Sequence, residues 1–406
     1  MGGVTRGTAN EGKATDRFAQ RSRRWTRLLT PSIGALALVA TAMLALPQTA
    51  NAANASTTHP AKTTGSAVPF LDTLHQVENI ASTVPSNGDV NPYGVAVVTK
   101  SVGDLVDHDT LVSNFNASSN LQGTGTTIVQ VAPGGKVSQF AQLNRPLPGL
   151  CPGGIGFTTA LVILHGGYVV VGSLPVTENG NGTPEAGCLI VLNAWGTPVA
   201  TWSGTLINGP WDMTAVQGAG WADLFVTNVL NGTVAANGKE VAGGTVIRLD
   251  VRLSSNEAPQ LISETVIATG FDEQLNSSAL VLGPTGDALG ATGTLYVADT
   301  INNRIAAVPN AVFRQSPAGW GGKTVSEGSA LDQPLGLMIA PDGDVIAANG
   351  ANGNAVEVTP TGHQVANVQM DPLNAGGDLF GLAVSPSGHG IVFVDDGDNT
   401  LKRFIP

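Results

Sequence analysis

The stretch Leu295-Tyr-Val-Ala-Asp-Thr-Ile-Asn-Asn-Arg-Ile305 shows the plan on which most of this chain is built. An apolar run ends in a small polar residue, an Asn-rich turn follows, and a second apolar run begins. Short apolar runs on both sides of a tight Asn or Gly turn are typical of a β-hairpin. The same plan recurs at residues 224–234, 346–356 and 392–401, so the hairpin is a repeated unit.

Around each hairpin lie further apolar strands and tight turns such as Pro341-Asp-Gly343 and Pro386-Ser-Gly388. Short strands repeated with a period of roughly 40 to 60 residues predict radially arranged sheets. The repeats begin near residues 91, 150, 210, 271, 331 and 379, and no segment has a convincing amphipathic helical pattern. The sequence therefore predicts an all-β, six-bladed β-propeller as a single domain over residues 70–406.

The sixth repeat ends after three strands, near residue 404, whereas residues 72–83 offer an unassigned strand before the first repeat. We expect this N-terminal strand to complete the last blade, because closure leaves no open sheet edge. A seven-bladed ring is the alternative if the long third or fourth repeat contains another sheet.

Residues 1–52 have the pattern of a signal peptide. Arg21, Arg23, Arg24 and Arg27 form a basic region, an apolar run follows over residues 33–46, and Ala50-Asn51-Ala52 offers a cleavage site. We expect export through the Sec route to the cell envelope, the periplasm or the medium; a Tat signal and an uncleaved anchor are the alternatives. Residues 53–69 are predicted to be a flexible linker.

The charge pattern excludes a class of partner. Charged residues make up 12% of the chain, and the formal net charge is −11. Without residues 1–52 the chain keeps 12 basic and 28 acidic residues, a formal charge of −16. Such a surface repels phosphate backbones, so nucleic-acid binding is not expected. We expect a monomer with no membrane span after signal cleavage.

The two cysteines, Cys151 and Cys188, fall within the second repeat. An exported chain can form a disulfide, and one repeat can bring both residues together. Two buried free thiols are the alternative.

Residues 334–343 and 295–305 resemble the NHL repeat, in which a Pro-x-Gly strand and an Asp-Gly turn precede a Tyr-Val-Ala-Asp-x-x-Asn-x-Arg-Ile hairpin. The resemblance is strongest in the last three repeats and weakest in the second. It implies the propeller architecture and suits an exported bacterial protein. NHL-type propellers include binding modules, sugar-lactone hydrolases and an amidating lyase, so the resemblance implies no single activity.

In the enzymes of this fold, the resemblance implies a metal held beside the motif glycine of the inner strands. Here that level carries Tyr93, Trp211, Leu335 and Phe380, which are aromatic or apolar. The sequence therefore favours an exported, non-catalytic binding or scaffold module for a peptide, a protein or a glycan. The expected binding residues on the channel mouth are Tyr93, Trp211, Phe380, Asn91, Asn208, Asp212 and Asp332.

The alternative function is a cation-dependent lactonase- or lyase-type hydrolase with its site at the channel mouth. Asp212, Asp332 and Asp378 are its candidate ligands for Ca²⁺, because calcium prefers carboxylate and amide oxygens. The competing interpretation is that these residues cap turns. A zinc site of three imidazoles is not expected, because most of the six histidines lie away from the mouth.

Overall fold

The computed structural model describes residues 68–143, 146–177, 182–371 and 378–406, all within the second of the chain's two units, Thr64–Pro406. The predicted signal peptide and residues 53–67 of the predicted linker lie outside the described residues. Within the described ranges the chain forms 25 strands and two short 3-10 helices, η1 (Leu71–Thr73) and η2 (Ala311–Phe313). No helix in these ranges is both long enough and apolar enough to cross a bilayer.

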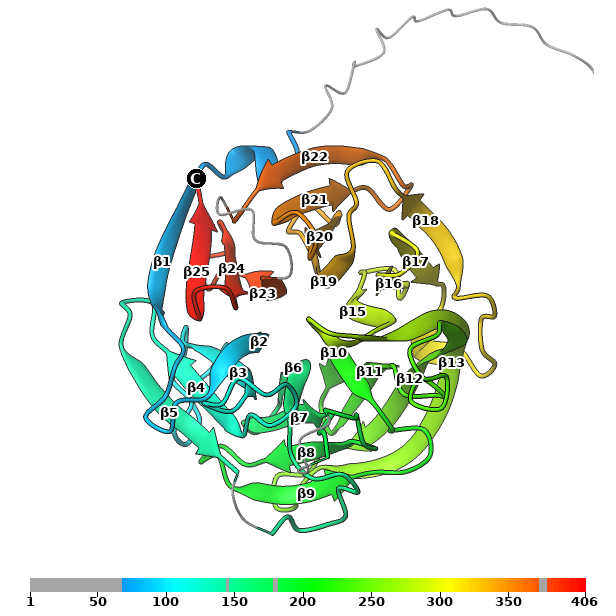
Figure 1. The fold of residues 1–406 in the computed structure, drawn as a ribbon. Coiled ribbons are helices and arrows are strands. Elements are labelled where there is room, and N and C mark those ends of the chain that lie inside the picture. The colour runs from blue at the N-terminus through cyan, green and yellow to red at the C-terminus, as the bar shows by residue number, and fades with distance from the viewer. Residues whose placement is uncertain (1–67, 144–145, 178–181, 372–377) are drawn as a thin grey trace, which may run out of the picture. The chain divides into compact units, whose positions relative to one another are not determined.

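Six antiparallel sheets stand around a central channel as propeller blades (Figure 1), which confirms the predicted fold. In the first five blades the strands follow one another from the channel outward. Blades 1 to 3 contain β2 (Val90–Val97), β3 (Thr110–Asn116), β4 (Thr127–Val131), β5 (Val137–Gln142); β6 (Phe157–Leu164), β7 (Tyr168–Ser173), β8 (Cys188–Leu192), β9 (Pro198–Trp202); and β10 (Pro210–Gly218), β11 (Trp221–Asn228), β12 (Val241–Arg252), β13 (Gln260–Asn276), β14 (Leu280–Leu282).

Blades 4 to 6 contain β15 (Pro284–Leu289), β16 (Leu295–Asp299), β17 (Arg304–Val308), β18 (Lys323–Glu327); β19 (Pro334–Ile339), β20 (Val345–Asn349), β21 (Asn354–Val358), β22 (Gln364–Gln369); and β23 (Leu379–Val384), β24 (Ile391–Asp395), β25 (Thr400–Ile405) with β1 (Gln76–Ser82).

Strand β16 explains why the repeated apolar runs form these blades. Leu295 and Val297 pack into a core shared with blade 3, whereas Tyr296 and Ala298 pack into a core shared with blade 5. Successive side chains of a strand point to opposite faces of its sheet. A strand between two neighbouring blades is therefore apolar at every position, and each blade buries both faces.

The ring closes as predicted. β1 pairs antiparallel with β25, from Gln76 opposite Ile405 to Ser82 opposite Thr400, and supplies the outer strand of blade 6. The buried Glu357 of blade 5 accepts hydrogen bonds from the backbone nitrogens of Phe70 (2.8 Å) and Leu71 (2.7 Å). β1 is thus paired within blade 6, and the segment just before it is fixed to blade 5.

Blade 3 is formed by the long third repeat, which is one reason why the sequence allowed a seven-bladed ring as an alternative. β12 has 12 residues and β13 has 17, and the short strand β14 folds back on the end of β13. The additional residues lengthen an existing sheet and carry β14 toward the channel mouth. The ring has six blades.

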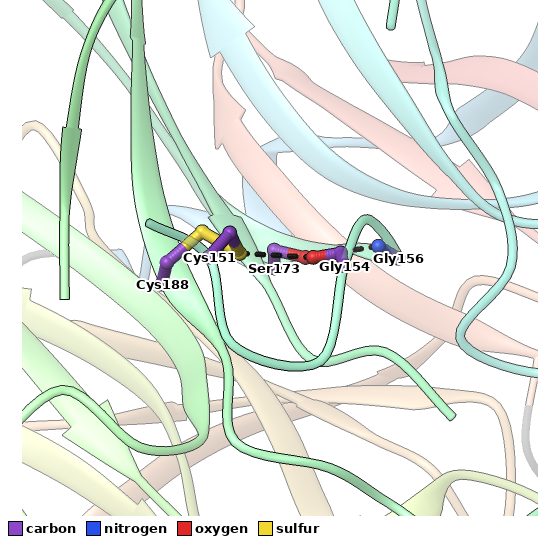
Figure 2. The surroundings of a disulfide bond; sticks show 5 residues. All are labelled: Cys151, Gly154, Gly156, Ser173 and Cys188. Carbon is purple, nitrogen blue, oxygen red and sulfur yellow. Dashed lines mark hydrogen bonds between the residues drawn. A yellow bond between two sulfur atoms is a disulfide. The ribbon is translucent and has the colours of Figure 1, made fainter. Parts of the chain in front are cut away.

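A disulfide joins Cys151 to Cys188, with their Cα atoms 5.2 Å apart (Figure 2). Cys188 begins β8 and is fully buried, whereas Cys151 lies in the segment before β6. The Ser173 hydroxyl accepts from the Gly156 nitrogen at 2.9 Å and donates to the Gly154 carbonyl at 3.0 Å. The segment before β6 is therefore fixed to blade 2 by a covalent bond and by hydrogen bonds, which include these two.

Candidate active site

The inner strands approach one another most closely at the glycine of the Pro-x-Gly segment. A Cβ on Gly336 would lie 2.0 Å from the Phe380 carbonyl oxygen, and a Cβ on Gly381 would lie 2.3 Å from that of Tyr93. Contacts this short are sterically forbidden, so glycine is required where one inner strand passes the next. This level is the narrow part of the channel.

Asp212 takes the glycine position in blade 3. The Ser113 hydroxyl accepts from the Gly94 nitrogen at 2.9 Å in blade 1, and the Thr227 hydroxyl accepts from the Asp212 nitrogen at 3.0 Å in the same way. The two backbones are thus held alike. In blade 3, a carboxyl group stands in the channel wall where blade 1 has only a hydrogen atom.

An aromatic plug of Tyr93, Phe115, Trp211 and Phe380 closes the mouth end of the channel. Ring centroids lie 3.8 Å apart for Tyr93 and Phe380, and 6.1 Å apart for Trp211 and Phe380. Because blades 3 and 6 stand opposite each other, the second pair meets across the channel axis. The Trp211 indole donates to the Val281 carbonyl at 3.0 Å, which fastens β14 to the plug.

The aromatic residues that were expected to bind a ligand are buried in the plug. Tyr93, Trp211 and Phe380 are 2%, 3% and 1% exposed, so they form a core and present almost no ring surface to a ligand at the mouth. Above them, the Gln122 side-chain amide donates to the Ser278 carbonyl at 2.5 Å. This bond joins the loops of blades 1 and 3 over the plug.

The polar residues expected at the mouth bond to different hairpins. Asn91 donates to Asp396 of blade 6 at 3.2 Å, Asn208 donates to the hairpin of blade 3, and Asp332 accepts from that of blade 5. The structure distributes them around the ring and does not gather them at one point. Asp212 is separate from all three, because its side chain faces the channel.

Asp378 belongs to an acidic group on blade 6. Carboxyl oxygens of Asp371, Asp378 and Asp395 lie within 4.8 Å of one another, and Lys402 neutralises Asp395 at 2.5 Å. Calcium binds through six to eight oxygen ligands. The side chains of Tyr93, Trp211 and Phe380 contribute no carboxylate or amide oxygen, so a calcium ion would have to be held by a group such as these three carboxyls and not by the aromatic ring.

Beyond the plug lies a cavity of about 390 Å³, lined by the inner strands of all six blades. Its lining runs from Gly336 and Gly381 to Leu289, Ile339 and Val384, the last residues of β15, β19 and β23. The cavity therefore extends from the narrow glycine level to the ends of the inner strands. It is reached from the face opposite the mouth.

Two adjacent carboxyl groups, Asp212 and Asp287, face this cavity from neighbouring blades. The Asp287 backbone nitrogen donates to Asp212 Oδ2 at 3.4 Å, and the Met213 nitrogen donates to Asp212 Oδ1 at 2.9 Å. Asp287 is 4% exposed, and within the described part of the chain neither of its carboxyl oxygens has a hydrogen-bond partner of proper geometry. Asp212 keeps partial exposure, which it owes to the cavity.

Burial changes the protonation of both groups. Burial raises the pKa of Asp212 to about 7, against smaller opposing effects of the Met213 and Asp287 backbone N–H groups. Burial and the Asp212 charge raise the pKa of Asp287 well above its ordinary range. Two carboxyls in one desolvated site do not both ionise readily, so the pair holds a proton near neutral pH.

Sequence reasoning singled out Asp212 but placed it at the mouth, and it missed Asp287. A signal was present for each residue. Pro210-Trp-Asp212 has an acid where the other motifs have glycine, and Asp287 follows the motif glycine of blade 4, where Val95 and Leu337 stand in blades 1 and 5. Both departures put a carboxyl group on a wall whose other residues are uncharged.

No protein-family model matches the chain, and no curated protein matches its sequence. Solved structures do resemble it. A luciferin-regenerating enzyme is 11% identical with a TM-score of 0.52, covering 82% of this chain and 95% of its own. Virginiamycin B lyase from Staphylococcus aureus is 13% identical (TM-score 0.47; 82% and 99%), and a gluconolactonase from Xanthomonas campestris is 12% identical (0.48; 84% and 97%).

At these identities the likeness shows a shared fold. The luciferin-regenerating enzyme nevertheless carries the name of an enzyme, and on this comparison the prediction of a non-catalytic binding or scaffold module is wrong. The enzymatic alternative is the better supported one.

Proposed function

We propose that this protein is an enzyme of the hydrolase or lyase type that uses Asp212 and Asp287 as an acid and base pair in the central channel. One observation carries the proposal: two adjacent carboxyl groups face a cavity, and Asp287 is almost completely buried, with the Thr214 backbone N–H nearby but no hydrogen bond of proper geometry to either oxygen from the described residues. A structural role would call for paired oxygens, because an unsatisfied buried polar group costs stability.

The pair provides the two proton transfers that bond cleavage requires. In a hydrolysis, the ionised carboxylate takes a proton from water as the water oxygen attacks a carbonyl carbon, and the protonated carboxyl gives its proton to the departing oxygen. In an elimination, the carboxylate takes a proton from carbon, a double bond forms, and the protonated carboxyl gives its proton to the leaving group. Both reactions need one base and one acid within reach of one bond.

The roles of the two residues follow from their surroundings. Asp212 gives up its proton first, because it keeps partial exposure and its pKa is about 7. Asp287 retains its proton to higher pH, because burial and the Asp212 charge raise its pKa further. Asp212 is therefore the base and Asp287 the acid, and the substrate approaches them from the face opposite the plug.

The named activities of the similar propellers support this reaction class. A gluconolactonase opens a cyclic ester and a lyase breaks a bond by elimination, and each reaction suits a paired acid and base. No step is assigned to a cation, because the two groups of described residues that could hold a metal ion, one of which contains Asp378, include neither Asp212 nor Asp287. The NHL type of the repeats and export to the cell envelope or beyond are further proposals that rest on the sequence.

The test is turnover of a panel of lactones and esters of increasing size at pH 8. We expect Asp212→Asn and Asp287→Asn to lower kcat by about 10²- to 10⁴-fold, the range of general acid–base catalysis. Asp342→Asn, which removes an exposed carboxyl from a turn of blade 5, is the charge-matched control and should keep full activity. Equal activity in all variants, or no turnover of any substrate, would overturn the proposal.

A further inference from the structure

The charged side chains that line the cavity are all acidic. Its lining contains Asp212 and Asp287 and no lysine, arginine or histidine from any of the six inner strands. No other titratable side chain faces the pair inside the cavity. Once one of the two carboxyls ionises, its charge has no cationic partner in the channel. An anionic ligand would be repelled both there and by the acidic surface of the protein.

The acceptors point to a particular kind of cation. Asp212 already accepts two backbone N–H bonds, whereas the carboxyl group of Asp287 has only the Thr214 backbone N–H nearby and makes no hydrogen bond of proper geometry with the described residues. The Thr159 hydroxyl, which lines the cavity, donates to the Trp211 carbonyl and can still accept a hydrogen bond. An ammonium group has three N–H donors and needs three acceptors, which these oxygens can supply.

A metal ion fits this lining less well. Hard divalent cations need six or more oxygen ligands, and the remaining side chains of the lining are mostly those of Ala, Val, Leu, Ile and Met. The two groupings of three or more metal-binding side chains in the described residues lie elsewhere and include neither Asp212 nor Asp287. A cavity of about 390 Å³ is at the small end of the range for small-molecule sites.

We propose that the channel site recognises a small substrate that carries an amine, held as an ammonium by Asp287 and Asp212. This inference rests on the proposed active site and adds the chemical class of the substrate. Once Asp212 has ionised and Asp287 still holds its proton, the pair carries one negative charge, which one ammonium balances. The amine thus anchors the substrate in a channel that offers no other charged contact.

Calorimetry with benzylamine and benzyl alcohol tests this, because the two probes share a shape and differ in charge. We expect wild type at pH 8 to bind benzylamine at least tenfold more tightly than the alcohol. The double variant Asp212→Asn, Asp287→Asn, which carries no charge in the channel, should lose this preference, and Asp342→Asn should keep it. At pH 5, where both carboxyls are protonated and the amine is still charged, benzylamine affinity should fall at least tenfold.

Equal binding of amine and alcohol, an unchanged preference in the double variant Asp212→Asn, Asp287→Asn, or calcium binding that displaces benzylamine from the pair would overturn the inference. Failure of the proposed reaction looks different. If benzylamine binds as expected but no lactone or ester is turned over, the amine site stands and the hydrolase or lyase activity fails. If neutral lactones are turned over and benzylamine does not bind, the reverse holds.

Discussion

Asp212 and Asp287 are unfavourable residues for the stability of the ring. One replaces a glycine at the narrowest level of the channel, and the other is buried with two unsatisfied oxygens. In the folded state each carboxyl group lies in surroundings that destabilise its charged form. Such a cost is typical of functional sites, where stability is lost in exchange for reactivity.

The cost of Asp212 depends on pH in a direction that can be worked out. Its folded-state pKa, about 7, is raised above the ordinary value, so the folded protein holds a proton that the unfolded chain has lost. The stabilising effect of that proton is fully present below about pH 4 and disappears as pH rises to about 7. Asp212→Asn should therefore be more stable than wild type by about 1–2 kcal/mol at pH 8.

Urea denaturation at pH 4 and pH 8 checks this prediction. Near pH 4 both proteins carry a neutral group at position 212, so the difference should nearly vanish. A variant that is less stable than wild type at pH 8, or a difference that is the same at both pH values, would contradict the raised pKa.

The glycine level gives a second prediction. Gly336→Ala would place a Cβ 2.0 Å from the Phe380 carbonyl oxygen, so the backbones of blades 5 and 6 must separate. We expect a loss of about 1–3 kcal/mol in the free energy of unfolding, as for overpacking in other cores. Gly134→Ala meets nothing within 4 Å and is the matched control, expected to be close to neutral. Equal effects of the two substitutions in urea melts would refute the close contact.

At the scale of elements, the strands could be predicted from the sequence because their signals are local. The hairpin at 295–305 contains both apolar runs and its own turn, and β1 completes blade 6 because a closed ring leaves one strand missing. The plug could not be predicted in this way. Trp211 meets Val281 of β14, 70 residues later, and Phe380 across the channel. The sequence near Trp211 predicts neither contact, because both partners are far away along the chain.

The same limit applies to the candidate site. Asp212 and Asp287 stand out as departures from the repeat, but their proximity depends on the pairing of neighbouring inner strands. The sequence located the acid in blade 3 and misjudged its depth, because one residue along an inner strand separates the plug from the cavity. Trp211 faces the plug and Asp212 faces the cavity.

The disulfide of blade 2 gives a prediction about the stability of that blade. Cys151 and Cys188 close a loop of 37 residues within blade 2. Loop-closure entropy predicts that the double variant Cys151→Ala, Cys188→Ala loses up to roughly 4 kcal/mol of stability. Thermal melts with and without reductant measure it: reductant should lower the Tm of wild type to that of the double variant and leave the variant unchanged. A wild-type Tm that does not respond to full reduction would contradict a stabilising role.

At the scale of the whole molecule, the ring depends on its N-terminal strand. Removing residues 1–83 deletes β1 and exposes the edge of β25, and an open edge invites pairing with other chains. We expect this chain to melt at lower temperature and to aggregate, whereas a chain that begins at residue 68 should behave as the full-length protein does. Light scattering during a thermal melt shows both effects. A monomeric shortened chain with an unchanged Tm would mean that β1 does not close the ring.

The shared proton of the channel pair is the central claim, and carboxyl ¹³C NMR of aspartate-labelled protein tests it most directly. In wild type, the resonances that disappear in Asp212→Asn and in Asp287→Asn should titrate at about pH 7 and above, respectively. In each single variant, the remaining partner should titrate at lower pH, because its neighbour no longer carries a charge. If both resonances titrate near pH 4 in wild type, the two carboxyls are ordinary surface-like acids, and the account of the channel as an active site fails.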